Sequence, residues 1–268
     1  MRDGRRGLRL LGLLLAVLAL GFGLSGCGDD DEVDVEAYCE DTLAIETIPE
    51  PDIDFESMSE EEQAEAAKKF ASEDLQPLAK KIQANAPEEI SGDIDTLVAA
   101  VDEVAETGNF GVFDSAETAE AGDDAHAFDL ANCGWESSEV TAKDYEFEGV
   151  AAEYEAGPTS FEFTNAGKEL HEFVVLKKKA DTEESFDELL ELPQEEAEGK
   201  VDQVGNVFAE PGDDDYFVAD LEEGEYIALC FIPVGLTPEA AKAAEEGGEE
   251  PQGPPHFTQG MRAEFTVG

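Results

Sequence analysis

The segment EYIALCFI, which runs from Glu225 to Ile232, is rich in aromatic and β-branched residues and lies between a glycine and a proline. A short run of this composition, bounded by turn-forming residues, predicts a β-strand. Five further segments have the same character: residues 143–150, 159–167, 170–178, 215–221 and 262–268. Regular short strands separated by turns predict an antiparallel sandwich, which we place at residues 139–268. Two interruptions of the pattern, at 182–192 and 237–247, have helical character.

The first half of the chain has a helical pattern instead. Ser59 followed three residues later by Glu62 is a capping-box arrangement, which predicts the start of a helix. Pro77 is expected to break or kink the helix that starts at Ser59. Apolar residues then recur at spacings of three and four, at Ile94, Leu97, Val98, Val101 and Val104. The chain is therefore expected to be a multi-domain α + β protein, in which a small disulfide-stapled helical bundle at residues 35–135 precedes an antiparallel Greek-key β-sandwich.

The charge of the chain is strongly one-sided. Its 268 residues include 67 acidic and 16 basic ones, for a net charge of −51. Such a surface repels phosphate backbones, which excludes nucleic acid as a partner. It attracts cationic partners, and a cationic redox protein is one such partner. Adaptation to a salty environment, where ions screen the repulsion between carboxylates, accounts for the same composition equally well.

The N-terminus has the pattern of an export signal. A basic start is followed by an apolar run from Leu10, by the small-residue tetrad LSGC that ends at Cys27, and by acidic residues. The tetrad resembles the lipobox of bacterial lipoproteins. This resemblance implies a signal peptide at residues 1–26, a lipid on the sulfur of Cys27, an acidic linker at 27–34, and a location at the outer face of the cytoplasmic membrane. An uncleaved transmembrane helix is the alternative.

Three cysteines remain beyond the lipidation site. Outside the cytoplasm thiols tend to form disulfides, and Cys39 and Cys133 bracket the helical half, so we predict a bond between them. Cys230 is then left over. A lone thiol in an oxidising compartment is either protected by a metal ion or buried as an inert side chain.

Four residues of the second half have metal-ligating side chains close to predicted strand ends: His171, Cys230, His256 and Met261. Two imidazoles, a thiolate and a thioether form a soft donor set that suits copper and suits oxygen-preferring metals poorly. His126 has acidic neighbours and could also hold a metal, but a surface histidine is the interpretation that we prefer there.

The order of these residues resembles that of the cupredoxins, the plastocyanin-like blue copper proteins. The resemblance rests on GEYIALC, on HFTQGM with its His-x4-Met spacing, on AEFTV, and on NAGKELHEFVV around His171. It implies a cupredoxin-like fold over residues 139–268 and one mononuclear type 1 copper site, with His171 and His256 as nitrogen ligands, Cys230 as thiolate ligand and Met261 as axial ligand. A hydrophobic collar is expected around it, formed by Phe231, Ile232, Pro233, Pro254, Pro255 and Phe257.

Two features depart from the pattern of that family. Cys230 and His256 are separated by 25 residues, far more than the ligand loop of small cupredoxins. Glu172 follows His171 at a position where the family often has a small polar residue. The first departure leaves open how an electron partner reaches the metal, and the second leaves open what surrounds Cys230.

The expected function is that of a membrane-anchored type 1 copper protein that carries single electrons outside the cytoplasmic membrane. The chain has no paired nucleophile and base, so we do not expect an enzyme. Two alternatives remain at this point: a lipoprotein that binds or delivers copper without redox cycling, and a copper-free binding module at the cell surface.

Overall fold

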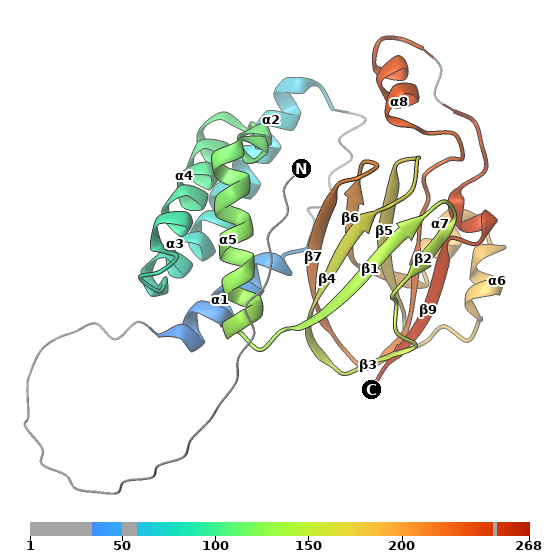
Figure 1. The fold of residues 1–268 in the computed structure, drawn as a ribbon, viewed down its shortest axis with the longest axis horizontal. Helices are drawn as coiled ribbons and strands as arrows, with labels where there is room; N and C mark the ends of the chain where they lie inside the picture. The colour runs from blue at the N-terminus through green and yellow to red at the C-terminus, as the bar shows by residue number, and fades with distance from the viewer. Residues whose placement is uncertain (1–33, 50–57, 249–250) are drawn as a thin grey trace, which may run out of the picture. The chain divides into compact units, whose positions relative to one another are not determined.

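The computed structural model describes residues 34–49, 58–248 and 251–268 (Figure 1). The predicted signal peptide, the lipidation site Cys27 and all of the acidic linker but its last residue lie outside this part of the chain. Residues 33–268 form one compact unit. Within the described ranges, every helix is too short or too polar to cross a bilayer.

The N-terminal half of the described chain is helical, as predicted. Its elements are α1 (Val35–Glu46), α2 (Glu60–Phe70), the π-helical turn η2 (Ala71–Leu75), α3 (Gln76–Asn85), α4 (Ser91–Thr107), the 3₁₀ turn η3 (Phe110–Asp114) and α5 (Ala116–Asn132). The capping box is present, because the Ser59 hydroxyl accepts from the Glu62 N–H and the Glu62 carboxylate accepts from the Ser59 N–H.

The helical path is not broken at Pro77, although a break was one of the two outcomes expected there. The chain passes from α2 into the π-helical turn η2, and Pro77 lies in the first turn of α3. No new helix begins at Pro77, because the Gln76 N–H still donates to the Ala71 carbonyl in the π-helical turn, and this turn accommodates the N–H that proline lacks. The wider turn of η2 thus lets one helical path continue past the proline without a break.

The helices share one apolar core that includes Tyr38 of α1, Ile82 of α3, Val98 of α4 and Phe128 of α5. The predicted disulfide between Cys39 and Cys133 is confirmed, and its Cα atoms are 5.3 Å apart. It joins α1 to the residue that ends α5. The first and last helices are therefore held together across most of the helical region.

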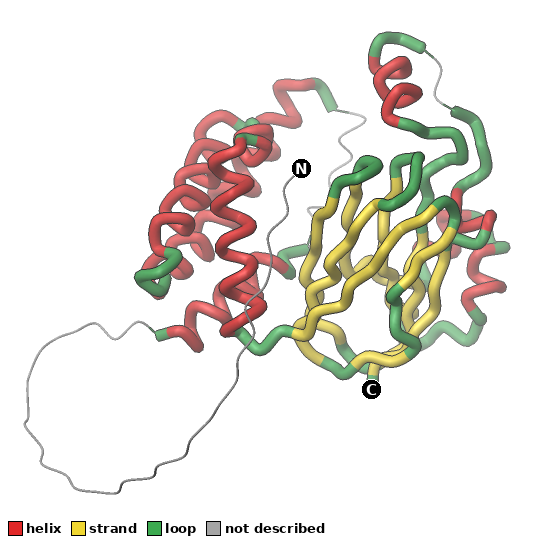
Figure 2. Tube along the Cα trace, in the orientation of Figure 1, coloured by secondary structure: helices red, strands yellow, loops and turns green. Residues whose placement is uncertain are grey.

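The C-terminal half is a β-sandwich of two sheets, which confirms the predicted fold class (Figure 2). One sheet has the strand order β2-β1-β4-β7, and the other has the order β3-β9-β8-β5-β6. The strands are β1 (Glu136–Lys143), β2 (Glu146–Glu148), β3 (Glu153–Tyr154), β4 (Gly157–Asn165), β5 (His171–Lys178), β6 (Val201–Ala209), β7 (Asp214–Leu221), β8 (Gly224–Leu229) and β9 (Arg262–Val267). Short helices interrupt it: α6 (Phe186–Leu190), α7 (Gln194–Glu198), α8 (Pro238–Glu245) and the 3₁₀ turn η4 (His256–Gln259).

Two strand pairs depart from a purely antiparallel arrangement. β1 runs parallel to β4, and β3 runs parallel to β9. The chain leaves the first sheet after β2, adds β3 to the edge of the second sheet, and returns to the first sheet as β4. Because this connection crosses between the sheets and is not a hairpin, it brings β4 back beside β1 in the same direction.

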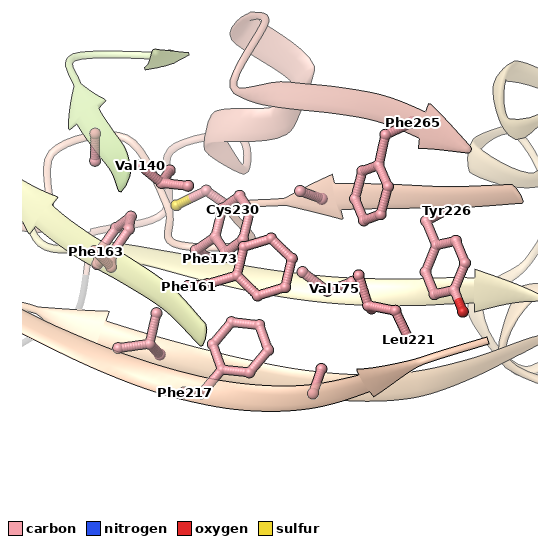
Figure 3. Packing of buried hydrophobic residues seen from close by; sticks show 14 of the residues in the cluster. Val140, Phe161, Phe163, Phe173, Val175, Phe217, Leu221, Tyr226, Cys230 and Phe265 are labelled. Atoms are coloured by element: carbon pink, nitrogen blue, oxygen red, sulfur yellow. The ribbon is translucent and has the colours of Figure 1, made fainter. Parts of the chain in front are cut away.

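The two sheets enclose an aromatic core that includes Phe161, Phe163, Phe173 and Phe217. These side chains come from β4, β5 and β7, and each of these strands has a run of three consecutive buried residues. Cys230 lies at one end of this core and Tyr226, on the same strand path, at the other (Figure 3). The sulfur of Cys230 is thus held in an apolar environment.

In the helical region, Asp129 of α5 is a buried carboxyl group with consequences for stability. Its side chain is only 3% exposed. Burial, together with the charge of Glu46, raises the pKa of Asp129 from 3.8 to about 7. The carboxyl group is therefore neutral in the folded protein over a pH range in which it is ionised in the unfolded chain.

We expect the free energy of unfolding to fall as the pH rises from about 4 to about 7, by up to about 4 kcal/mol from this residue alone. The stabilisation is complete below the pKa that Asp129 has in the unfolded chain. It is lost as the pH rises to the pKa that Asp129 has in the folded protein. The free energy of unfolding of Asp129→Asn, measured by urea unfolding at a series of pH values, should not show this fall between about pH 4 and about pH 7, because asparagine does not ionise. Asp124→Asn, an exposed position of the same helix, is the matched control. Parallel pH curves for wild type and Asp129→Asn would contradict the expectation.

Candidate metal centre

The four predicted ligand residues lie at the ends of neighbouring strands of one sheet. His171 is the first residue of β5, and Cys230 directly follows β8. His256 begins the turn η4, and Met261 directly precedes β9. β8 pairs with both β5 and β9, so three separate segments meet at this end of the sheet. All four side chains are fully buried.

The donor atoms of three of these residues converge. Nδ1 of His171 and Nδ1 of His256 are 3.1 Å apart. The Cys230 sulfur lies 3.3 Å from Nδ1 of His256 and 4.0 Å from Nδ1 of His171. Among the described residues, this is the one group of three or more His, Cys, Asp or Glu side chains with metal-binding spacing.

Met261 is tied to the same cluster through the backbone. Its N–H donates to the carbonyl of His256 over 3.2 Å, and its carbonyl accepts from the N–H of Cys230 over 3.3 Å. Its side chain packs in the same buried cluster as Cys230. The His-x4-Met spacing thus forms a tight turn with both residues next to the cysteine.

Glu169 holds the outer edge of the His256 ring. Its carboxylate accepts from Nε2 of His256 over 2.9 Å, from the Tyr145 hydroxyl over 3.1 Å, and from the Gly235 N–H over 2.7 Å. Burial opposes ionisation of Glu169, but these donors outweigh burial and hold its pKa below the usual range. With its proton on Nε2, His256 presents the lone pair of Nδ1 to the cluster.

The ring of His171 is neutral and has an unpartnered nitrogen. Burial, with the neighbouring His256 adding to it, lowers the pKa of His171 from 6.5 to about 4. Its Nε2 is buried without a hydrogen bond, and the nearest carboxylate oxygen, of Asp144, is 3.9 Å away. Gly167 closes over this edge, since a Cβ at that position would come within 2.6 Å of Nε2.

The unpartnered nitrogen is what a metal-binding cluster predicts. Two Nδ1 atoms 3.1 Å apart can share one proton, and because His256 carries its own on Nε2, the shared proton belongs to His171. Nε2 of His171 is then an acceptor facing the Asp144 carboxylate, which cannot donate to it. If Nδ1 of His171 held a metal ion, the ring proton would lie on Nε2 and would face the Asp144 carboxylate. The hydrogen-bonding arrangement around His171 is therefore satisfied better with a metal ion on Nδ1 than with a proton on Nδ1.

The Cys230 thiol points to the same conclusion. Burial raises its pKa to about 12, so the thiolate does not form at neutral pH without a cation beside it. A bound metal ion supplies that positive charge. Two imidazoles, a thiolate and a thioether are a donor set typical of a mononuclear type 1 copper site.

Glu172, the departure noted in the sequence, has a structural role. Its carboxylate accepts from the N–H of Phe231 over 2.7 Å, and burial raises its pKa. It therefore links β5 to the residue that follows Cys230. This side chain fixes the backbone next to the sulfur.

The long insert between Cys230 and His256 does not separate the two ligands. Its ends are bridged by Pro233 and Pro255, and Phe257 donates its N–H to the carbonyl of Cys230 over 2.9 Å. The insert folds outward and contains the helix α8 (Figure 1). The expected collar is present in part as a contact between Phe231, which is 42% exposed, and Phe257, with ring centroids 5.5 Å apart.

The expectation for His126 was wrong in one respect. The residue is buried, with 8% of its surface exposed, and its ring stacks on Tyr216 with centroids 3.5 Å apart. Its Nε2 lies 2.9 Å from the Glu162 carboxylate. Its acidic neighbours in sequence suggested a surface position, whereas Glu162 of β4 and Tyr216 of β7 cover the ring.

Comparisons with known proteins give matches among solved structures that cover about half of this chain. No family model matches the chain, and no curated protein matches it. A solved structure of reduced auracyanin from Roseiflexus castenholzii matches with 18% identity and a TM-score of 0.31, over 49% of this chain and 96% of that one. Auracyanin A of Chloroflexus aurantiacus, titled a blue copper protein, matches with 14% identity and a TM-score of 0.31, over 50% of this chain and 100% of that one. Rusticyanin from Thiobacillus ferrooxidans matches with 16% identity and a TM-score of 0.29, over 50% of this chain and 78% of that one.

Proposed function

We propose that this protein binds one copper ion in a type 1 site and carries single electrons. The observation that carries the proposal is the convergence of the Cys230 sulfur with Nδ1 of His171 and Nδ1 of His256 in a fully buried cluster. Met261 would supply a fourth and weaker ligand through its thioether sulfur. Copper, when bound, supplies one-electron exchange between its two oxidation states.

The contribution of the chain is a rigid and dry site. The ligands are attached to paired strand ends, and Glu169 orients the ring of His256. A site that is already formed changes little in geometry when the charge of the ion changes, which favours fast electron transfer. Burial of all four side chains excludes water, and burial is one of the factors that set the redox potential of such a site.

The surface next to the site suggests where an electron enters or leaves. Nε2 of His256 is covered by Glu169 and Tyr145, so its ring edge is not available at the surface. Phe231, directly after Cys230, is exposed. We infer that a redox partner docks near Phe231, and the net charge of −51 favours a cationic one.

The envelope location is part of the same proposal. The LSGC tetrad before the described residues supports lipidation at Cys27 and anchoring outside the cytoplasmic membrane. The disulfide between Cys39 and Cys133 agrees with an oxidising compartment. Membrane fractionation of a Cys27→Ala variant, which should release the protein, tests the anchor.

Burial of the ligands argues against a role in copper delivery. A protein that hands on its metal has to let a ligand of the recipient reach the ion, and all four side chains here are closed off from solvent. Electron transfer has no such requirement, because an electron crosses a layer of side chains without atomic contact.

Titration of the purified protein with Cu(II), followed by visible absorption, tests the proposal. We expect one equivalent to bind and to give an intense sulfur-to-copper charge-transfer band, which a reductant bleaches and an oxidant restores. A colourless complex that holds only Cu(I) would favour delivery. Failure to bind copper, with stability unchanged by a chelator, would favour a copper-free binding module.

A further inference from the structure

A second feature of the molecule lies far along the chain from the copper ligands, in the helical region. A hollow of about 800 Å³ lies between α1, α3, α4, α5 and the start of β7. Its volume is within the range of roughly 300–1,000 Å³ that is usual for small-molecule sites. Much of its wall is apolar and comes from α3 and α4, including Ile82, Leu97 and Val101.

The polar part of the wall is rich in acidic side chains. It includes five carboxyl groups, those of Glu46, Asp123, Asp129, Asp214 and Asp215, while no lysine or arginine lines the hollow among the described residues. Asp129 is 3% exposed. Acidic side chains that adapt a protein to salt are solvated at the surface, so that explanation does not cover a carboxyl group inside the fold.

Tyr38 gives an independent indication of a ligand. Its side chain is 0% exposed and lines the hollow, and its hydroxyl group has no hydrogen-bond partner. The hydroxyl group faces Asp129 and Thr42 without hydrogen-bond geometry to either, and both residues line the hollow. An unpartnered buried hydroxyl costs free energy unless a ligand or water satisfies it.

Aromatic rings complete the site. His126 stacks on Tyr216, and both line the hollow together with Tyr38 and Phe113. Aromatic faces attract organic cations, particularly where carboxylates lie close by. Apolar walls, aromatic rings and uncompensated carboxyl groups together select a ligand with an apolar body and a positive charge.

We propose that this hollow binds an organic ammonium ion, which lies beside the carboxyl group of Glu46 and donates hydrogen bonds to the Asp129 carboxyl group and the Tyr38 hydroxyl, with its apolar body against the residues of α3 and α4. Glu46 at the C-terminal end of α1 is exposed and lines the hollow next to the helical core, so it can meet an entering cation. The Tyr38 hydroxyl accepts a hydrogen bond from the ammonium group. The site is separate from the copper centre and does not depend on it.

Three probes with the same body test the charge requirement: 2-phenylethylammonium, 2-phenylethanol and phenylacetate. Isothermal titration calorimetry on the whole protein at about 1 M NaCl screens the exposed acidic surface, where the Debye length is about 3 Å. We expect the ammonium ion to bind one to one, at least about tenfold more tightly than the alcohol. Phenylacetate should show no binding.

Two pairs of variants locate the site. Gly122 of α5 lines the hollow and Gly92 of α4 does not, and nothing lies within 4 Å of a Cβ at either position. Gly122→Leu should fill the hollow and weaken ammonium binding at least about tenfold, whereas Gly92→Leu should leave it unchanged. Glu46→Gln should weaken binding roughly fivefold, and Glu40→Gln on the same helix should have no effect. Circular dichroism checks that each variant is folded.

Each outcome decides the proposal. Preference for the ammonium ion that is lost in Gly122→Leu and reduced in Glu46→Gln supports it. Equal binding of ammonium and alcohol would mean an apolar hollow without charge selection and would overturn it. Ammonium binding that persists in Gly122→Leu would mean association with the acidic surface, and no binding of any probe would likewise end the proposal.

Discussion

Cys230→Ser is expected to abolish the visible charge-transfer band of the copper-loaded protein completely. The band requires a thiolate bonded to Cu(II), and the Cys230 sulfur is the thiolate source within 3.3 Å and 4.0 Å of the two histidine Nδ1 atoms. Serine keeps the size and burial of the side chain but offers a hydroxyl group, which does not ionise at neutral pH. Because two imidazoles remain, we expect the variant to bind Cu(II) weakly and without intense colour.

Absorption and electron paramagnetic resonance spectra at one equivalent of Cu(II) measure this change. The matched control is the double variant Cys39→Ala/Cys133→Ala, which also loses sulfur but leaves the cluster intact. Its band should have wild-type intensity. If Cys230→Ser kept the band, the sulfur would not be a ligand, and the proposed copper site would fail.

The sequence predicted the classes of structure well because they depend on local patterns. The capping box at Ser59 and the strand at Glu225 to Leu229 follow from residues that are close along the chain. The parallel pairing of β1 with β4 does not, because alternation of side chains assigns a face of a strand and leaves its neighbour and direction open. Pro77 illustrates the same limit, since the π-helical turn before it depends on how the helices pack.

Some residues of the candidate site could likewise be predicted from the sequence, and others could not. His171, Cys230, His256 and Met261 stood out because His, Met and Cys are rare in this chain, with three, three and four copies. Glu169 could not stand out, since it is one of 67 acidic residues and lies 87 positions from the histidine that it holds. The packing of two sheets selects it, and no local signal marks it.

His126 shows how composition can mislead. Aspartates at 123, 124 and 129 gave its helix a solvent-exposed character in the sequence. Its burial follows from Tyr216 and Glu162, which reach it from two strands that are far along the chain. In a protein this acidic, a carboxylate is weak evidence for exposure, as the buried Asp129 also shows.

Removal of the disulfide in Cys39→Ala/Cys133→Ala is expected to lower the free energy of unfolding by about 4–5 kcal/mol. The bond closes a loop with a sequence separation of 94 residues, and a long loop restricts the unfolded chain strongly. The helical core is small, and the bond joins its first and last helices. The loss should therefore be a large share of the stability of a domain of this size, which is usually about 5–15 kcal/mol.

Urea unfolding of the metal-free protein, followed by far-ultraviolet circular dichroism, measures this loss. Treatment with dithiothreitol should destabilise the wild type by a similar amount and leave the double variant unchanged, because the variant has no disulfide to reduce. This comparison separates the cross-link from the packing of the two side chains, since reduction keeps both sulfurs in place. A loss below about 1 kcal/mol would mean that the packing of α1 against α5 already restricts the chain as much as the bond does.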